Sequence, residues 1–334
     1  MPAPLIRPDA RGLFCAAGGF HVDPWRPAEV AVITHAHSDH ARVGSSLYHA
    51  AAPGLGLLRR RLGPEAEIVG HDYGTPFRLG EATVSFHPAG HVLGSAQIRV
   101  EAGGAVWVVS GDYKVEPDPS CADFELVPCD VFITEATFGL PIYRWDPFDQ
   151  VMDEIFAWWD ANARAGRASM LFGYALGKAQ RLLAGIAQRS NRPVFVHGAI
   201  EPMVEAYRAE GIHLVATEPV GLTERGRSFA GELILAPPSA FASPWMRRFG
   251  DARTAFLSGW MRVRGNRRRR GFDHGFVVSD HADWHQLLAT VRATGARQVY
   301  ATHGYADALA RYLREADGLD AQPLQTLYGG EVED

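Results

Sequence analysis

Residues 33–44, ITHAHSDHARVG, place His35, His37, Asp39 and His40 within six positions, directly after a short apolar run. Imidazole nitrogens and carboxylate oxygens suit Zn²⁺, and also Mn²⁺ or Fe²⁺. In an extended loop His35 and His37 point to the same side, whereas Asp39 lies beyond them, where the chain turns. Four ligands this close in sequence cannot all bind one ion without strain. The pattern therefore predicts two neighbouring ions, each bound by two of these four residues.

Further ligands must come from elsewhere, because a zinc ion takes about four ligands, some of them water. Three candidates follow apolar segments: His91 in AGHVLGSA (89–96), Asp112 in VVSGDYK (108–114) and His303 in YATHGYA (300–306). A single histidine or aspartate at such a position is more often a cap or a satisfied surface group. Three of them together, each after a predicted strand, favour a metal site over a loop that is rich in histidine by chance.

The composition limits the classes of function. The 334 residues are 47% hydrophobic, which is enough for one large core or two domains, and the net charge is −5. Any contact with nucleic acid must therefore come from a local patch. The three cysteines form no CxxC pair, which fits a reducing compartment. Because no apolar run approaches about 18 residues, we expect a cytoplasmic protein with no signal peptide and no membrane span.

Two patterns of secondary structure divide the chain. Up to about residue 140, segments rich in Val, Ile and Phe predict short strands at residues 29–34, 83–89, 96–102, 105–112 and 130–136. One helix is expected around residues 41–50. From residue 147 helical stretches alternate with strands, as in PFDQVMDEIFAWWDANARA and SMLFGYA, which predicts a parallel sheet with its own core. Similar strand–helix units continue from residue 272.

Basic residues gather in the run RVRGNRRRRG, residues 262–271, which contains Arg262, Arg264, Arg267, Arg268, Arg269 and Arg270. At the rim of a cleft these arginines would contact phosphates, and the alternative is a solvated charged loop. The segment GYALGK also places Lys178 at a strand-to-helix turn, which favours anion binding. The alternative is that GYALGK is an ordinary helix start that binds no anion.

The order of the motifs resembles that of the metallo-β-lactamase fold: THAHSDH (34–40), GHVLGSA (90–96) and SGDYK (110–114). Four later segments resemble motifs of β-CASP nucleases: TEATFG (134–139), YALGKAQRLL (174–183), VSDHADW (278–284) and THG (302–304). With GLFCAAGGFHVDPW (12–25), the chain looks most like bacterial ligase-associated DNA exonucleases. The resemblance implies an α/β fold, a metallo-β-lactamase αββα sandwich of residues 1–145 and 271–334, with an inserted β-CASP α/β domain over residues 146–270.

The resemblance also implies roles for single residues around two divalent metal ions, Zn or Mn. His35, His37 and His91 would bind one ion, Asp39, His40 and His303 would bind the other, and Asp112 would bridge the two. Asp23, in HVDPW, would orient the groups behind the ligands. His281 is the candidate general acid, because imidazole titrates near neutral pH, and Glu135 would fix its tautomer. The alternative for His281 is a core histidine in the first turn of a helix.

These features predict a metal-dependent nuclease that hydrolyses phosphodiester bonds of DNA, an exonuclease in DNA repair, in functional association with a DNA ligase and a helicase. An RNA-processing nuclease of the same fold is an alternative, because a histidine at the position of His303 is typical of the RNA-processing members. A thioester or lactone hydrolase of the plain lactamase fold would lack the insertion. A catalytically inactive binding module would be expected to have lost ligands, and none is missing.

Overall fold

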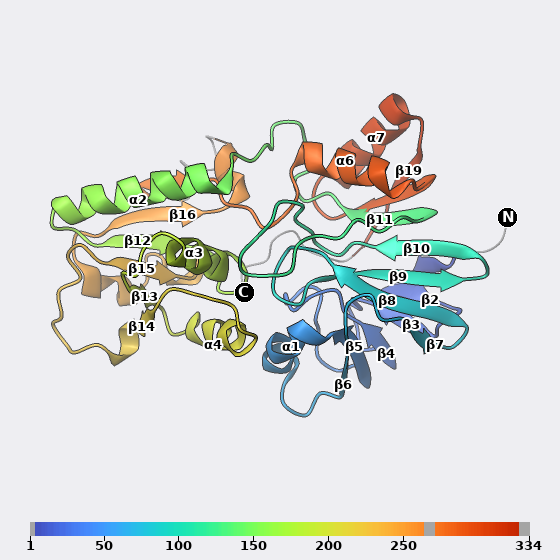
Figure 1. Cartoon of the computed structure of the whole chain (residues 1–334), viewed down its shortest axis with the longest axis horizontal. Helices are drawn as coiled ribbons and strands as arrows, with labels where there is room; N and C mark the ends of the chain where they lie inside the picture. The colour runs from blue at the N-terminus through green and yellow to red at the C-terminus, as the bar shows by residue number, and fades with distance from the viewer. Residues whose placement is uncertain (1–3, 264–270, 327–334) are drawn as a thin grey trace. The chain divides into compact units, whose positions relative to one another are not determined.

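The computed structural model describes residues 4–263 and 271–326, which divide into two compact units (Figure 1). The first unit contains the described residues 4–141 and 281–326, and the second contains those between 142 and 280. The chain therefore leaves the first unit once and later returns to it. None of the described helices is both long and apolar enough to cross a membrane.

The boundaries differ from those expected at residues 145 and 271. The division falls after Pro141 and again after Asp280. The later return has a simple cause: strand β17 (His274–Phe276) pairs in parallel with β16 (Arg253–Leu257) and so extends the sheet of the second unit. The chain returns to the first unit at His281, which is ten residues later than the expected start of the last part of the chain at residue 271.

The first sheet of the first unit contains six strands in sequence order: β1 (Ile6–Pro8), β2 (Leu13–Cys15), β3 (Phe20–Val22), β4 (Val30–Val32), β5 (Leu47–Ala51) and β6 (Ile68–His71). The first three strands pair antiparallel, and β3 to β6 pair in parallel. A short 3-10 turn η1 (Ala52–Gly54) leads from β5 into helix α1 (Leu55–Leu62).

The prediction of a helix at residues 41–50 is wrong. Residues 47–51 form β5, which pairs with β4 on one side and β6 on the other, and the helix starts only at Leu55. The segment LYHAA has no strong local preference for a strand, so its backbone pairing on both edges decides its conformation.

The second sheet has the strand order β19-β18-β11-β10-β9-β8-β7. Its strands are β7 (Phe77–Leu79), β8 (Ala82–Pro88), β9 (Ala96–Ala102), β10 (Ala105–Val109), β11 (Val131–Glu135), β18 (Gln298–Thr302) and β19 (Asp320–Pro323). Strands β7 to β10 pair antiparallel, whereas β10, β11, β18 and β19 pair in parallel. The strands expected from the apolar segments are therefore confirmed.

The two sheets pack face to face, and helices cover the outer face of the second sheet. Phe20 of the first sheet and Phe86 of the second belong to the core between the sheets, as do Trp107 and Val109. Val108 instead packs among residues of α6 (Trp284–Thr294) and α7 (Ala306–Asp317). Successive side chains of β10 thus enter opposite cores, which explains why its sequence AVWVV is apolar throughout.

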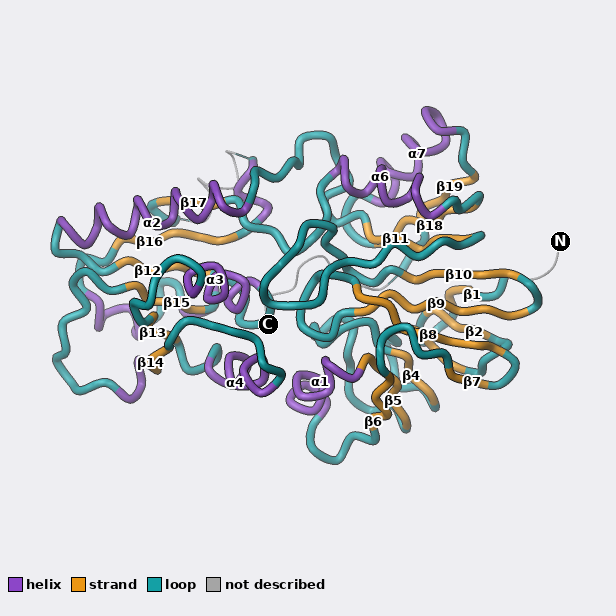
Figure 2. Tube along the Cα trace, in the orientation of Figure 1, coloured by secondary structure: helices purple, strands orange, loops and turns teal. Residues whose placement is uncertain are grey.

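The second unit is built on one fully parallel sheet, ordered β14-β13-β15-β12-β16-β17 (Figure 2). Its remaining strands are β12 (Ser169–Phe172), β13 (Val194–Val196), β14 (Thr217–Pro219) and β15 (Leu233–Ala236), and its helices are α2 (Phe148–Arg164), α3 (Lys178–Ala187) and α4 (Glu201–Ala209). Four 3-10 turns follow: η2 (Val220–Leu222), η3 (Pro238–Ala240), η4 (Pro244–Phe249) and η5 (Gly259–Arg262). The parallel sheet with its own core, predicted from the alternation after residue 147, is confirmed.

Candidate metal centre

Strand direction brings the candidate ligands to one edge of the second sheet. Strands β8, β10, β11 and β18 run in the same direction, because two antiparallel steps separate β8 from β10 and the later pairings are parallel. His91, Asp112 and His303 follow the carboxyl ends of β8, β10 and β18. Glu135 is the last residue of β11 at the same edge. The loop with His35 follows β4 of the facing sheet and completes the cluster.

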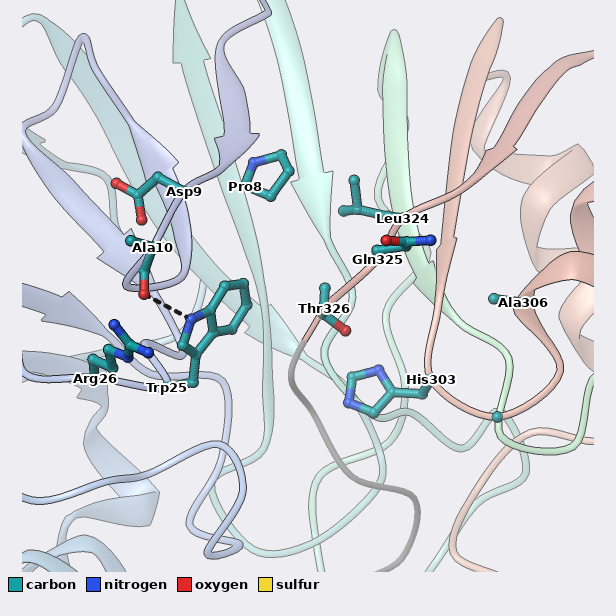
Figure 3. Close-up of a pocket in the computed structure, with 11 residues that line it drawn as sticks. Pro8, Asp9, Ala10, Trp25, Arg26, His303, Ala306, Leu324, Gln325 and Thr326 are labelled. Carbon is teal, nitrogen blue, oxygen red and sulfur yellow. Dashed lines mark hydrogen bonds between the residues drawn. The ribbon is translucent and has the colours of Figure 1, made fainter.

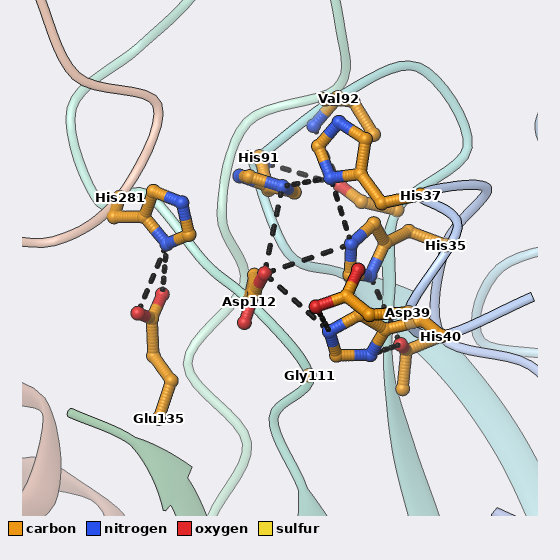
Figure 4. A network of polar contacts seen from close by, with 12 residues as sticks. His35, His37, Asp39, His40, His91, Val92, Gly111, Asp112, Glu135 and His281 are labelled. Atoms are coloured by element: carbon orange, nitrogen blue, oxygen red, sulfur yellow. Dashed lines mark hydrogen bonds and ion pairs between the residues drawn. The ribbon is translucent and has the colours of Figure 1, made fainter. Parts of the chain in front are cut away.

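Three imidazoles and one carboxylate form the first group (Figure 4). Nδ1 of His37 lies 3.0 Å from Nε2 of His35 and 3.1 Å from Nε2 of His91. Oδ2 of Asp112 lies 3.6 Å from Nε2 of His35 and 3.9 Å from Nε2 of His91. All four ligand atoms lie within 4.8 Å of one another, which is the spacing that one shared cation requires.

Asp39, His40 and His303 form the second group, whose ligand atoms also lie within 4.8 Å of one another. Nε2 of His40 is 3.8 Å from Oδ2 of Asp39 and 3.6 Å from Oδ2 of Asp112. The rings of His40 and His303 stack with their centroids 5.2 Å apart. Asp112 is thus within 4 Å of imidazole nitrogens in both groups, so the structure brings together every ligand that the sequence predicts.

The residues present fit divalent cations. Their donors are imidazole nitrogens and carboxylate oxygens, which is the set that zinc and manganese take. Oδ1 of Asp112 is buried and accepts no hydrogen bond from the described residues. A buried carboxylate oxygen without a donor is costly, and a bound cation would remove that cost.

Asp23 lies directly behind the ligands and holds them in place. Its Oδ1 accepts a hydrogen bond from the backbone N–H of Thr34 at 2.7 Å, and its Oδ2 lies 2.8 Å from Nδ1 of His40. The Thr34 hydroxyl donates to Oδ2 as well, at 2.5 Å. Because a carboxylate accepts, the Nδ1 of His40 carries its proton and Nε2 faces the cluster. Asp23 thus contacts His40 and the residue before His35, and its orienting role stays a prediction.

The backbone is unusual at two of these residues. Asp23 has a φ of 40° and His303 a φ of 62°, in a region that residues other than glycine rarely adopt. Next to His303, Gly304 also has a positive φ, and a Cβ there would meet the Cα of Thr137 at 2.5 Å. At Gly90, before His91, a Cβ would lie 2.2 Å from the carbonyl oxygen of Lys114. Strain retained at such positions is typical of functional sites.

His281 and Glu135 lie beside the first group. Nδ1 of His281 is 3.0 Å from Oε1 and 2.9 Å from Oε2 of Glu135, and Oε1 also accepts from the backbone N–H of Tyr113 at 2.8 Å. The imidazole of His281 lies 4.7 Å from that of His91, measured between ring centroids. Ligand atoms of Asp112, Glu135 and His281 lie within 4.8 Å of one another.

The electrostatics of the cluster favour the metal-binding form at some residues and the protonated form at others. Burial, together with the neighbouring imidazoles, lowers the pKa of His35 well below its usual value and that of His303 to about 3. Burial would lower the pKa of His40 too, but the carboxylates of Asp39, Asp112 and Asp23 overcome it and raise this pKa to about 10. Burial raises the pKa of Asp112 to about 7. A bound cation would favour the ionised carboxylate and the neutral imidazoles.

The basic residues predicted to bind nucleic acid are placed differently. Lys178 is 1% exposed, its Nζ lies 2.7 Å from Oδ1 of Asp280, and it sits over the ring of Tyr174. Arg262 pairs with Asp146 at 2.7 Å. The ammonium of Lys178 is therefore engaged within its unit, and its role in nucleic-acid binding stays a prediction. The remaining arginines of the run lie outside the described residues: Arg264, Arg267, Arg268, Arg269 and Arg270.

The sequence analysis missed Arg61, on the last turn of α1. Its Nε donates to the carbonyl oxygen of Ala36 at 3.1 Å, and Ala36 separates His35 from His37. Nothing local distinguishes Arg61 from the two arginines that precede it. Only the packing of α1 beside the histidine loop reveals the contact.

Comparison with known proteins adds the evolutionary context. No family model matches the chain. It is 32% identical over 317 residues to a "Probable DNA ligase" of Opitutus terrae, an alignment that covers 93% of this chain and 30% of that protein. It is 27% identical over 195 residues to "Ribonuclease TTHA0252" of Thermus thermophilus, covering 49% of this chain and 44% of that protein. It is also 31% identical over 150 residues to "Endoribonuclease YSH1" of Gibberella zeae, covering 43% and 18%.

The chain thus spans less than half the length of each of these relatives. A crystal structure of a protein of unknown function from Enterococcus faecalis shares the fold, with a TM-score of 0.58 and 13% identity over 90% of this chain and 78% of that one. The two ribonucleases and the ligase-named protein support a relationship to β-CASP nucleases. They leave the choice between DNA and RNA open.

Proposed function

We propose that this chain is a dinuclear metal-dependent nuclease with a metallo-β-lactamase fold and a β-CASP insertion, and that it acts in the cytoplasm as a DNA exonuclease in DNA repair. The observation that carries the proposal is the convergence of two groups of ligands on Asp112, next to the His281–Glu135 pair. The first unit would be the metallo-β-lactamase domain, and residues 142–280 would be the insertion.

The ligand groups suggest which residues would hold the ions, Zn or Mn. His35, His37 and His91 would hold one, Asp39, His40 and His303 would hold the second, and Asp112 would contact both. Ions held in this way would lower the pKa of water and neutralise charge on the phosphoryl oxygens. Asp23 would keep His40 in the tautomer that such binding needs.

The other step of phosphodiester hydrolysis is proton transfer to the leaving oxygen. Glu135 accepts from Nδ1 of His281, so Nε2 of the protonated ring can donate a proton. His281 and Glu135 would therefore act as general acid and its positioning partner.

DNA is the substrate that we propose. The similarity that covers nearly the whole chain is to part of a protein named as a probable DNA ligase. It also supports a functional association with a DNA ligase, and the resemblance of the motifs adds a helicase. Processing of RNA is the second candidate, favoured by His303 and by the similarity to two ribonucleases.

End-labelled DNA and RNA of the same sequence test the proposal. The protein is stripped with a chelator, its metal content is measured, and Zn²⁺, Mn²⁺ or Mg²⁺ is added back before a time course. We expect stepwise loss of nucleotides from DNA that stops on chelation and returns with Zn²⁺ or Mn²⁺. Faster turnover of RNA would move the proposal to the RNA alternative. Full activity with a verified empty site would contradict metal dependence.

A further inference from the structure

A cavity of about 690 Å³ opens in the first unit and reaches the candidate ligand His303 (Figure 3). Four segments line it: residues 8–10, residues 25–26, residues 303, 304 and 306, and residues 324–326. Figure 3 shows the indole of Trp25 and the imidazole of His303 on facing sides of the cavity. The volume lies within the range of small-molecule sites, roughly 300–1,000 Å³, and is large for a bare phosphate ion.

One wall of the cavity carries a cation. Arg26 is exposed, and its guanidinium makes no ion pair or hydrogen bond with the part of the chain that the structure describes. Asp9 lines the same cavity, and its carboxylate makes its contacts with other groups: it lies 3.0 Å from Nε2 of His21 and accepts from the backbone N–H of Arg11 at 2.7 Å and of Gly12 at 3.0 Å. A guanidinium that makes no ion pair with a carboxylate binds phosphate well through its N–H donors.

The remaining walls suit a flat, partly apolar group. Trp25 is nearly buried and its position is fixed, because its Nε1 donates to the carbonyl oxygen of Ala10 at 3.1 Å. Leu324 adds apolar surface, and the Thr326 hydroxyl is hydrogen-bonded to that of Thr302 at 2.8 Å, next to His303. A cation, an indole and an apolar wall together fit a nucleotide, whose phosphate is charged and whose base is flat.

We propose that this cavity is a nucleotide subsite that takes a nucleoside 5′-monophosphate, as free product or as the terminal unit of a strand. Arg26 binds the phosphate, and Trp25 and Leu324 contact the base or the sugar. The inference rests on the proposed function, because the cavity borders the metal centre only through His303.

Equilibrium titration of the holoprotein tests the subsite without turnover. The probes are dAMP, AMP and inorganic phosphate, and binding is followed by calorimetry. Arg26→Gln removes the charge, and Arg311→Gln is the matched control, because Arg311 is an exposed arginine of the same unit outside the cavity. We expect Arg26→Gln to weaken binding of dAMP about tenfold or more, and Arg311→Gln to leave it unchanged. Trp25→Phe should weaken it less, and unfolding curves check that each variant folds.

The outcomes separate the subsite from the proposed function. An unchanged Kd for dAMP in Arg26→Gln, no binding of dAMP to the wild type, or binding of inorganic phosphate as tight as that of dAMP would overturn the subsite, even if the protein is a nuclease. Binding of dAMP that depends on Arg26 in a protein that cleaves no nucleic acid would support the subsite and reject the nuclease. Tighter binding of AMP than of dAMP would assign the subsite to ribonucleotides.

Discussion

Nδ1 of His281 lies 2.9 Å from Oε2 of Glu135, and the two side chains are 4% and 0% exposed. An acceptor on Nδ1 leaves Nε2 as the nitrogen that can exchange a proton with a substrate. The two residues come from distant parts of the chain, the end of β11 and the turn before α6. Their pairing lies next to Asp112, where the proposed general acid would act.

His281→Ala should slow cleavage of DNA by about 10²–10⁴-fold, because a positioned general acid contributes about that much. A p-nitrophenyl phosphodiester should lose much less, since nitrophenolate leaves without a proton. Glu135→Gln should show the same pattern more weakly, because it disturbs His281 without removing it. The measurement is kcat on both substrates for the wild type and the two variants.

Metal content is the control for these variants, because ligand atoms of Asp112, Glu135 and His281 lie close enough to share an ion. Both variants should retain the metal of the wild type. An emptied site, or equal slowing on both substrates, would make His281 a ligand or a structural residue.

Asp112→Asn should be among the most damaging single changes. Oδ2 of Asp112 lies 3.6 Å from Nε2 of both His35 and His40, so removing its charge weakens both ligand groups at once. Asparagine keeps the shape and isolates the effect of charge. We expect loss of bound metal by elemental analysis and a fall in nuclease activity of about 10³-fold or more. Normal metal content with near-normal turnover would refute a shared role for this carboxylate.

Asp23→Asn tests the group behind the ligands. The Asp23 carboxylate accepts from two groups of Thr34 and from Nδ1 of His40, and an amide has one acceptor oxygen. Metal affinity should fall about 10–100-fold, as for other partners of metal ligands. Thr34→Val removes only the hydroxyl and should cost less. Equal metal affinities in all three proteins, measured by competition with a chelator, would show that Asp23 serves only the fold.

The grouping of the candidate metal ligands could be predicted from sequence because several of them follow strand ends, and the ends of strands that run in one direction meet at one edge. His91, Asp112 and His303 are separated by long stretches of chain, yet the direction of β8, β10 and β18 alone brings them together. Pairing of β5 with both neighbours could not be predicted, since LYHAA carries no local signal for it.

Tertiary contacts determine two other features that the sequence alone does not reveal, the burial of Lys178 and the place of strand β17. Lys178 looks like a surface cation beside a helix start, but its partner Asp280 lies about a hundred residues further along the chain, and the pair is buried. Strand β17 joins the second unit through pairing with β16, so the return to the first unit comes later than composition suggests. Long-range backbone pairing and buried ion pairs leave no periodic trace in a single sequence.

His49 should make the protein sensitive to acid. Its Nδ1 lies 2.9 Å from Nε2 of His71, and burial lowers the pKa of His49 to about 4. A folded pKa below the unfolded value of about 6.5 means that this contribution to stability is complete above about pH 6.5 and is lost as the pH falls toward 4. Urea unfolding of His49→Gln in chelator at about pH 7.5 and about pH 5 should show a smaller decline than the wild type. Parallel declines would exclude His49 as a source of the acid sensitivity.

Arg61 should support the histidine loop from outside the metal centre. Its Nε donates to the carbonyl oxygen of Ala36 at 3.1 Å, and this carbonyl lies on the backbone between His35 and His37. Arg61→Ala removes the donor, and a hydrogen bond from a charged group contributes about 1.5–3 kcal/mol. If part of that energy holds the loop in its binding conformation, metal affinity should fall about five- to tenfold.

The matched control for Arg61 is Arg59→Ala, because Arg59 is exposed on the same turn of α1. Arg59→Ala should leave metal affinity unchanged, and Arg61→Lys should restore part of what Arg61→Ala loses. Unfolding of each variant in chelator separates an effect on α1 itself from one on the loop, since only the latter disappears when metal is absent. If Arg61→Ala and Arg59→Ala bind metal equally well, the contact with Ala36 stabilises the fold and has no part in positioning His35 and His37.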